Sequence, residues 1–225
     1  MEREVRLWLR LDHPNVLPLL GFFLEGTNAI PNLVSQWMIN GTVTRYLLNR
    51  PFVVLEICKI VPSGLIYLHD KQKIVHSDLK GANILVSDDG NPLLADFGLS
   101  ISSSTLSLSG TTNHGSKGSV RWMARELISV EELDHTFKTD IWSYGMVICE
   151  LLTQKIPYSS VPNKRIRKAI SEGELPLEPD FGHLANGDVC HGLWQICQSC
   201  WREVPSQRPS AQTILGAVEK LMNPI

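Results

Sequence analysis

The spacing of apolar positions predicts one helix and one strand near the start of the chain. Val5, Trp8 and Leu9 recur at the i, i+3, i+4 spacing of one helix face, which predicts a helix over residues 2–11. The apolar run over residues 33–38 predicts a strand, and Asn40-Gly41 after it predicts a turn.

Most of the remaining chain carries helical periodicity. A short helix is expected over residues 42–49 and a longer one over residues 51–70. The buried residues of the longer helix are expected to include Ile57, Ile60, Leu65 and Leu68. Further helices are expected over residues 139–152, 163–170 and 210–221.

Two segments interrupt this helical pattern. Residues 84–86 and 93–95 are short apolar runs on either side of Asp89-Gly90, which predicts a β-hairpin. Residues 100–119 are rich in Ser, Thr and Gly and poor in apolar residues, so we expect a mobile loop there.

Composition and charge narrow the class of protein. The 225 residues are 43% hydrophobic, which is enough for one sizeable core. The formal charge of −2 gives no reason to expect nucleic acid or an anionic membrane as a partner. No apolar run reaches the roughly 20 residues that span a bilayer, and residues 1–6 lack the apolar stretch of a signal peptide. We therefore expect an intracellular, cytoplasmic location.

The five cysteines allow two interpretations. Cys197 and Cys200 form a C-x-x-C, and Cys190-His191 lies nearby, as in some zinc sites. Cys197, Cys200 and their neighbours Trp194, Ile196 and Trp201 also fall at helical spacing. This second pattern favours cysteines that pack in the core.

Four polar residues carry the chemistry of the chain. Lys80 lies two residues after Asp78, Asn83 lies five after it, and Asp96 follows the predicted hairpin. Phosphoryl transfer from ATP needs a carboxylate that orients the acceptor hydroxyl, an ammonium that offsets charge, and an amide and a carboxylate that hold Mg²⁺. The alternative is that Asp78 and Asn83 are turn residues and Asp96 ends a strand.

These residues stand in phrases that resemble the protein kinase superfamily. The family phrases H-R-D-L-K-x-x-N, D-F-G and A-P-E have counterparts in residues 76–83, 96–98 and 124–126. The resemblance covers essentially the whole chain and implies the α+β class, with a protein-kinase-like fold and a mostly helical C-lobe. It implies that residues 1–38 are a partial N-lobe, with the αC helix and strands β4 and β5, and that residues 39–225 are the C-lobe.

The resemblance also implies a role for each site residue. Asp78, Lys80 and Asn83 would be catalytic, and Asn83 and Asp96 would bind Mg²⁺. ATP would further meet Glu4 of the αC helix and the hinge, formed by Gln36, Trp37 and Met38. Glu4 can also be interpreted as a solvated acid at a helix start.

Other matches concern residues that would hold the site in place and residues that indicate which hydroxyl is phosphorylated. Asp140 would be buried and bond the backbone of the catalytic loop, although it could also be an ordinary helix N-cap. The C-W…R-P signature at residues 200–209 resembles tyrosine-kinase-like and tyrosine kinases, and implies an ion pair between Arg208 and Glu126. Lys80 fits Ser/Thr kinases, and so does Ser119 at the position of a Thr that bonds the catalytic Asp and Lys.

The chain departs from the family pattern in three places. No G-x-G-x-x-G occurs, and no β3 Lys precedes Glu4, so the N-lobe is expected to be truncated and apolar surface near Leu33 to lose its cover. Ser77 replaces the Arg that docks a phosphorylated activation loop in the family. Arg125 replaces the Pro of A-P-E, which restores a backbone donor and adds a charge.

Three functions, and one explanation of the truncation, are compatible with these observations. The first is a Ser/Thr kinase of tyrosine-kinase-like type that uses ATP and Mg²⁺ to phosphorylate proteins, impaired in the chain as given. A pseudokinase that acts as a binding or regulatory module is the alternative. An incomplete chain, with the absent strands upstream, explains the truncation best. A small-molecule phosphotransferase fits less well, because it would be expected to lack the activation segment and the Glu126–Arg208 pair.

Overall fold

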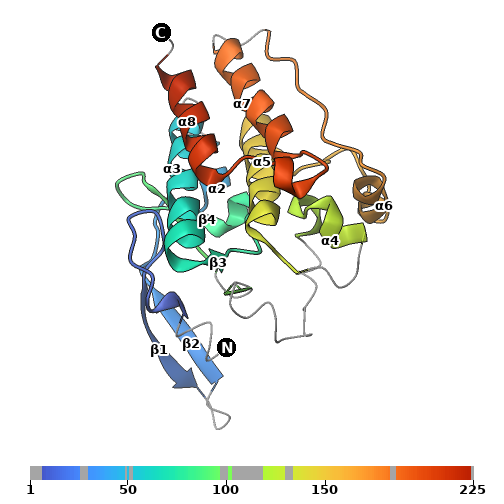
Figure 1. The fold of residues 1–225 in the computed structure, drawn as a ribbon. Helices are drawn as coiled ribbons and strands as arrows, with labels where there is room; N and C mark the ends of the chain where they lie inside the picture. Colours follow the sequence, from blue (N-terminus) through green and yellow to red (C-terminus); the bar gives the residue numbers. More distant parts are fainter. Residues whose placement is uncertain are drawn as a thin grey trace.

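The computed structural model describes residues 7–25, 30–48, 50, 53–96, 101–102, 119–129, 134–182 and 186–223. These residues form a mostly helical body and a β-ribbon that projects from it (Figure 1). The strands of the described part pair in two-stranded sheets, so the α+β class is as predicted. Glu4 and the first half of the helix predicted over residues 2–11 lie outside the described residues, and in the described half only residues 7–8 are helical.

The projecting ribbon consists of β1 (Leu19–Glu25) and β2 (Ile30–Ser35), paired antiparallel. The predicted extension of this strand to residue 38 is wrong, because Met38 is buried in the core and its carbonyl accepts a 3.0 Å bond from the Gly41 N–H. β2 therefore ends at Ser35, and the Met38 carbonyl closes a turn over residues 38–41. The ribbon exposes apolar side chains, as predicted near Leu33: Leu20, Phe22, Phe23, Leu24, Leu33 and Val34.

Two helices follow the ribbon. The short α2 (Val43–Leu47) begins where the Thr42 side chain accepts a hydrogen bond from the Arg45 N–H. The longer α3 (Val54–Ile66) continues as a π-helix, η2 (Tyr67–Gln72). Its predicted residues Ile57, Leu65 and Leu68 are buried. Ile60 is only partly buried, because Val61 and Pro62 occupy the core side of that turn.

Pro62 stands inside α3, where proline removes the bond to the carbonyl four residues earlier. That carbonyl belongs to Cys58, and the Tyr144 hydroxyl donates a 2.5 Å hydrogen bond to it. Burial raises the pKa of Tyr144 well above its ordinary value, so the phenol keeps its proton and remains a donor. The helix is thus continuous across a residue that usually breaks one.

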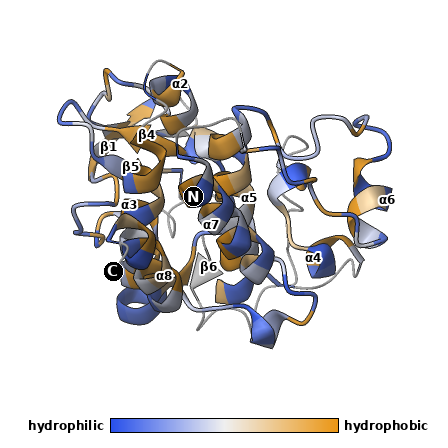
Figure 2. Cartoon of the chain, turned by 90° about the horizontal axis from the view of Figure 1, so that it is seen from above, coloured by the Kyte–Doolittle hydropathy of each residue, from blue (hydrophilic) through white to orange (hydrophobic). Residues whose placement is uncertain are grey.

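The central helix of the body is α5 (Phe137–Thr153), which packs against α7 (Gly187–Cys200), while α3 packs against α8 (Ala211–Met222). Hydrophobic positions gather where these helices face the interior (Figure 2). All five cysteines are buried in the body, and Cys197 and Cys200 are core residues of α7 as the helical spacing predicted. None of the described helices is long and apolar enough to cross a membrane.

The shorter elements surround the lower end of α5. The predicted hairpin is confirmed, with β4 (Ile84–Val86) antiparallel to β5 (Pro92–Leu94). β3 (Ile74–Val75) pairs with β6 (Ile101–Ser102), so residues 101–102 form a strand rather than part of the predicted loop, because the backbone of β3 offers them a partner. The remaining elements are η3 (Gly81–Asn83), η4 (Val120–Trp122), α4 (Arg125–Ser129), α6 (Ile166–Ser171) and η5 (Pro205–Gln207).

Candidate active site

Asp78, Lys80 and Asn83 converge in the loop between β3 and β4. The Lys80 ammonium lies 2.6 Å from Asp78 Oδ2. The Asn83 amide donates to the same oxygen at 3.0 Å and to the Asp78 carbonyl at 2.8 Å. Asp78 and Asn83 are each only 7% exposed, so these charge-assisted bonds are largely shielded from water.

This arrangement leaves one oxygen of each side chain without a protein donor among the described residues. The Asn83 amide nitrogen is occupied by Asp78, which directs Oδ1 of the amide away from that bond. Asp78 accepts both of these side-chain hydrogen bonds through Oδ2, so Oδ1 of its carboxylate remains available to another donor. An amide oxygen is a ligand type that Mg²⁺ accepts, and a carboxylate oxygen can accept a proton from a hydroxyl group.

The β4–β5 hairpin brings Asp96 next to Asn83. Ile84 pairs with Leu94, and the Ala95 N–H donates a 2.9 Å hydrogen bond to the Asn83 carbonyl. Asp96 has a φ of 62°, a left-handed conformation that Asp adopts more readily than most residues, and its side chain is exposed. Phe97 and Gly98 of the D-F-G phrase lie outside the described residues.

Asp140 of α5 holds the start of the loop that carries Asp78, Lys80 and Asn83. Its carboxylate accepts hydrogen bonds from the backbone N–H groups of His76 at 2.8 Å and Ser77 at 3.0 Å, and lies 2.8 Å from His69 Nε2. Burial alone would raise the pKa of Asp140, but the hydrogen bond and charge of His69 and the His76 contacts outweigh it, so this pKa is lowered. The N-cap of α5 is Thr136, which excludes the alternative interpretation of Asp140.

His76 supports Asp78 from inside the loop. Its side chain is fully buried, and this burial lowers the pKa of His76. A neutral imidazole keeps one acceptor nitrogen, and the Asp78 N–H is 3.4 Å from Nδ1 of His76. Ser77, between them, has a φ of 73° and is held by its N–H bond to Asp140.

Two further contacts join the loop to more distant segments. The Lys80 ammonium donates a 2.8 Å hydrogen bond to the Ser119 hydroxyl, as expected for a Ser at this position. Glu150 of α5 accepts 2.9 Å bonds from the Gly81 N–H and from the Trp122 indole. Burial raises the pKa of Glu150, and these two donors offset part of that rise. Sequence reasoning missed Glu150, although a single acid within the apolar run of residues 146–152 was a visible signal.

Gly81 is tightly enclosed between α2 and α5, which leads to a prediction. An added Cβ would lie 2.5 Å from the Thr44 methyl group and 2.8 Å from Glu150 Oε2. We expect Gly81→Ala to destabilise the fold by about 1–3 kcal/mol, as overpacking does, and to lower activity by displacing the loop. The measurement is urea unfolding together with an activity assay.

Gly216→Ala provides the matched control, because a Cβ there meets nothing within 4 Å in the middle of α8. This variant should be neutral or stabilised by up to about 1 kcal/mol. Equal stability of the two variants would contradict the enclosure of Gly81.

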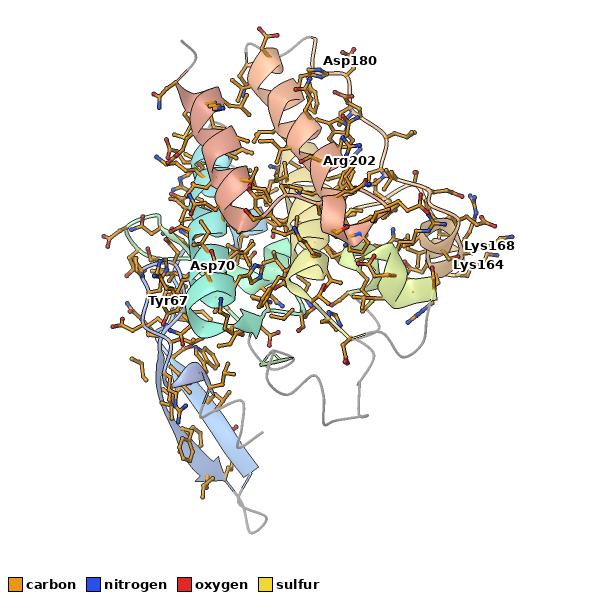
Figure 3. The ribbon with its side chains drawn as sticks, in the orientation of Figure 1. Tyr67, Asp70, Lys164, Lys168, Asp180 and Arg202 are labelled. Atoms are coloured by element: carbon orange, nitrogen blue, oxygen red, sulfur yellow. The ribbon has the colours of Figure 1, made fainter. Side chains whose placement is uncertain are left out.

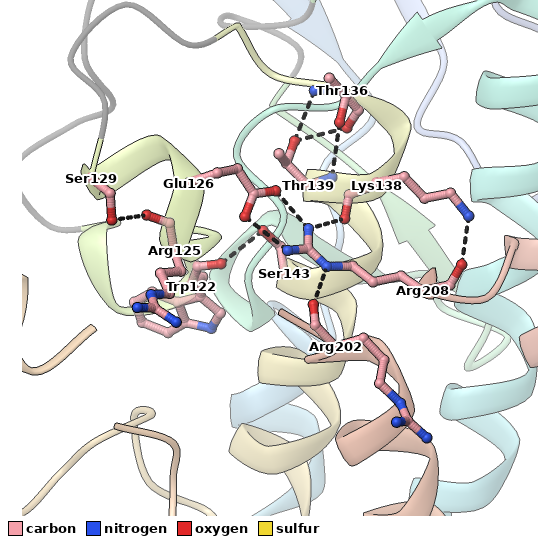
Figure 4. Close-up of polar contacts among 10 residues, drawn as sticks. All are labelled: Trp122, Arg125, Glu126, Ser129, Thr136, Lys138, Thr139, Ser143, Arg202 and Arg208. Atoms are coloured by element: carbon pink, nitrogen blue, oxygen red, sulfur yellow. Dashed lines mark hydrogen bonds and ion pairs between the residues drawn. The ribbon is translucent and has the colours of Figure 1, made fainter. Parts of the chain in front are cut away.

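The Arg208–Glu126 ion pair fixes α4 to the body (Figure 4). The guanidinium donates two bonds to the carboxylate, at 2.6 and 2.8 Å, and others to the carbonyls of Arg202 and Lys138. The two bonds form the predicted pair in a bidentate geometry. The Arg208 side chain is fully buried and also lies over the Trp142 ring. Arg125, beside it, bonds the Ser171 carbonyl and Glu203 instead.

The expected adenine-binding residues are less closely associated with this cluster. Gln36 and Trp37 follow the end of β2, and both are exposed, with Trp37 85% exposed. Met38 is 5% exposed and packs in the core. The side chains of Gln36 and Trp37 make no hydrogen bond with other described residues.

Comparison with known proteins identifies the family. A model described as "protein tyrosine and serine/threonine kinase" matches residues 1–218, and the chain belongs to this protein kinase family. Serine/threonine/tyrosine-protein kinase HT1 of Arabidopsis thaliana is 31% identical over 226 residues, which cover 96% of this chain and 53% of the relative. Mitogen-activated protein kinase kinase kinase ANP1 of the same plant is 34% identical, over 96% of this chain and 31% of its own.

Similarity extends to tyrosine kinases. Cytoplasmic tyrosine-protein kinase BMX of Homo sapiens is 28% identical over 225 residues, which cover 97% of this chain and 31% of that kinase. The chain thus spans about half or less of the length of these curated relatives.

Proposed function

We propose that this protein is a Ser/Thr protein kinase, which transfers the γ-phosphate of ATP to hydroxyl groups of protein substrates. The observation that carries the proposal is the Lys80 ammonium, which lies between the Asp78 carboxylate and the Ser119 hydroxyl. Lys80 at this position fits Ser/Thr kinases, and Ser119 provides the hydroxyl that such a lysine bonds. Because one relative is named a tyrosine-protein kinase, Tyr is the competing acceptor.

The proposed mechanism assigns one task to each side chain. Asp78 accepts or orients the proton of the substrate hydroxyl through its remaining oxygen, while Lys80 offsets the charge of the transferring phosphoryl group. Asn83 and Asp96 provide oxygen ligands that fit Mg²⁺, which when bound neutralises phosphate charge. Asp140 and Glu150 keep the backbone of the loop in place, since both accept its N–H groups.

The ATP-binding part of the proposal rests on the family. Backbone groups of Gln36, Trp37 and Met38 would meet adenine, and Glu4 would help to position the phosphates. We propose residues 1–38 as the N-lobe portion and residues 39–225 as the C-lobe. The 225 residues contain no G-x-G-x-x-G, so we expect them to bind Mg-ATP weakly and to transfer phosphate slowly on their own.

The absence of a G-x-G-x-x-G from the 225 residues supports the second candidate function, a pseudokinase that serves as a binding or regulatory module. The two are distinguished by incubating the protein with Mg²⁺, γ-labelled ATP and a mixed protein substrate such as casein, followed by phosphoamino acid separation. Phosphoserine or phosphothreonine that disappears in Asp78→Asn supports the kinase. Phosphotyrosine alone would contradict the Ser/Thr assignment, and no transfer beyond the Asp78→Asn background would favour the pseudokinase.

Ser77 leads to a prediction about regulation. In the family an Arg at this position docks a phosphorylated activation loop, whereas the Ser77 side chain is short and lies within 3.4 Å of the Val75 carbonyl. We expect activity to be independent of phosphorylation at residues 102–112. The test compares initial rates of the untreated protein, the phosphatase-treated protein and a variant with every Ser and Thr of residues 102–112 replaced by Ala. A rate that rises on phosphorylation and stays low in the Ala variant would contradict this prediction.

A further inference from the structure

The surface around α6 carries an unusual concentration of positive charge. Four of the five residues from 164 to 168 are basic and exposed, in a chain whose net charge is −2. The side chains of Lys164 and Lys168 point outward from the edge of the body (Figure 3). We define the α6 basic surface as Lys164, Arg165, Arg167 and Lys168.

Two of these four charges remain uncompensated within the described residues. Arg165 is paired with Glu174, and Lys168 lies 3.7 Å from Glu172. Lys164 and Arg167 form no ion pair or hydrogen bond with any residue that the structure describes. Local pairing thus accounts for half of the positive charge and leaves the other half directed at solvent.

The α6 basic surface is connected to the candidate active site by a short chain of contacts. Lys80 bonds Ser119, and Arg121 follows two residues later in η4. The buried Arg121 guanidinium donates to the carbonyls of Pro157, Tyr158 and Val161 and, at 2.7 Å, to the Asn163 side chain. Asn163 directly precedes Lys164.

A second connection fixes α6 from the other side. Arg125 Nε donates a 3.1 Å bond to the carbonyl of Ser171, the last residue of α6, and α6 packs against α4 and η4. The segment that contacts Lys80 and the segment that bears the four cations are therefore held in one relative position. Asp78 and the α6 basic surface are thus joined through Lys80, Ser119, Arg121 and Asn163.

We propose that the α6 basic surface binds an acidic segment of the protein substrate, a few residues away from the phosphorylated hydroxyl. This inference rests on the proposed function and adds a substrate class to it. The patch is small and is bordered by Glu172 and Glu174, which favours a short acidic peptide. Nucleic-acid binding usually neutralises about 6–10 phosphates, more than two free cations can provide. Exposed charges of this kind mainly steer and orient a partner.

A binding experiment tests the proposal without requiring catalysis. The probe is a fluorescent Ser-containing peptide with a tract of Glu and Asp placed about four, eight or twelve residues from the Ser, at roughly 3.3 Å per extended residue. The same peptide with Gly and Ser in place of the tract is the reference. We expect the acidic peptide to bind more tightly at one of these spacings, with an affinity that falls as salt is added.

The variant that removes the effect is Lys164→Glu with Arg167→Glu, because neither side chain is paired with another residue in the part of the chain that the structure describes. It should weaken binding of the acidic peptide about tenfold, equivalent to about 1.4 kcal/mol, and leave the reference peptide unchanged. Arg202→Glu with Lys220→Glu makes the same change of charge at exposed positions away from α6 and should bind as the parent does. Thermal unfolding of all variants checks that each is folded.

Activity assays separate this inference from the proposed function. If the protein phosphorylates the acidic peptide, the α6 variant should raise KM for that peptide about tenfold and leave kcat and KM for ATP unchanged. If the α6 variant weakens binding of the acidic peptide but no phosphorylation occurs, the inference about the α6 basic surface is supported and the proposed kinase activity is contradicted. Phosphorylation and binding that ignore both the tract and the variant would overturn the inference alone. Binding of phosphatidylserine vesicles or duplex RNA to this surface, with no binding of the acidic peptide, would also overturn it.

Discussion

Replacement of Asp78 by Asn is expected to lower kcat about 10²–10⁴-fold, the usual contribution of a positioned acid or base. The amide retains the shape of the side chain and one oxygen for the donors Lys80 and Asn83. It lacks the carboxylate charge that accepts a proton from the substrate hydroxyl. We therefore expect KM for ATP and the unfolding temperature to change little. Initial rates with Mg-ATP and a protein acceptor, together with thermal unfolding, measure the two effects.

Asp70→Asn is the matched control for this variant. Asp70 is an exposed acid in η2, labelled in Figure 3, and it forms no ion pair with other described residues. The same chemical change should leave kcat unaltered there. If Asp78→Asn kept more than about half of the parent rate, the role proposed for Asp78 would be wrong.

Glu126→Gln is expected to cost about 3 kcal/mol of unfolding free energy, at the lower end of the range for breaking a buried ion pair. Arg208 is fully buried on its side chain, whereas the Glu126 side chain is 20% exposed. The Gln amide group would face the guanidinium with a donor in place of an acceptor, which leaves a buried cation undercompensated. The remaining carbonyl partners and the Trp142 ring limit the loss. Urea unfolding at constant pH gives the free energy.

The neighbouring ion pair serves as the comparison. Glu203→Gln breaks the 2.7 Å contact with Arg125, in which the two side chains are 75% and 31% exposed. Exposed pairs contribute less than about 1 kcal/mol, so this variant should unfold nearly as the parent does. A loss for Glu126→Gln no larger than that for Glu203→Gln would refute a stabilising role for the buried pair.

Local sequence signals predicted those parts of the fold that depend on nearby residues. The β4–β5 hairpin was predictable because Asp89-Gly90 supplies the turn between two apolar runs, and Gly90 has a φ of 85°. The end of β2 was not predictable from local sequence, because it depends on burial of Met38 in a core formed by distant helices. The burial of Ile60 was mispredicted for a similar reason, since Pro62 takes a core position in α3 with help from Tyr144.

The candidate site shows the same division. The spacing of Asp78, Lys80 and Asn83 predicted their convergence, because five residues of one loop cannot separate them far. The contacts of Asp140 with the loop and of Arg208 with Glu126 came from the family resemblance, since the partners lie more than 60 residues apart. Glu150 was missed, because its partners, the Gly81 N–H and the Trp122 indole, are brought to it only by the tertiary fold.

The attachment of the loop that carries Asp78 to Asp140 has a consequence for when this loop can form during protein synthesis. The N–H groups of His76 and Ser77 are 64 and 63 residues away in sequence from the carboxylate that accepts them. A nascent chain synthesised only as far as the β4–β5 hairpin already contains Asp78, Lys80 and Asn83 but lacks this acceptor. The loop can therefore adopt its final geometry only after the first turn of α5 has left the ribosome, so that assembly of the site is a late event in translation.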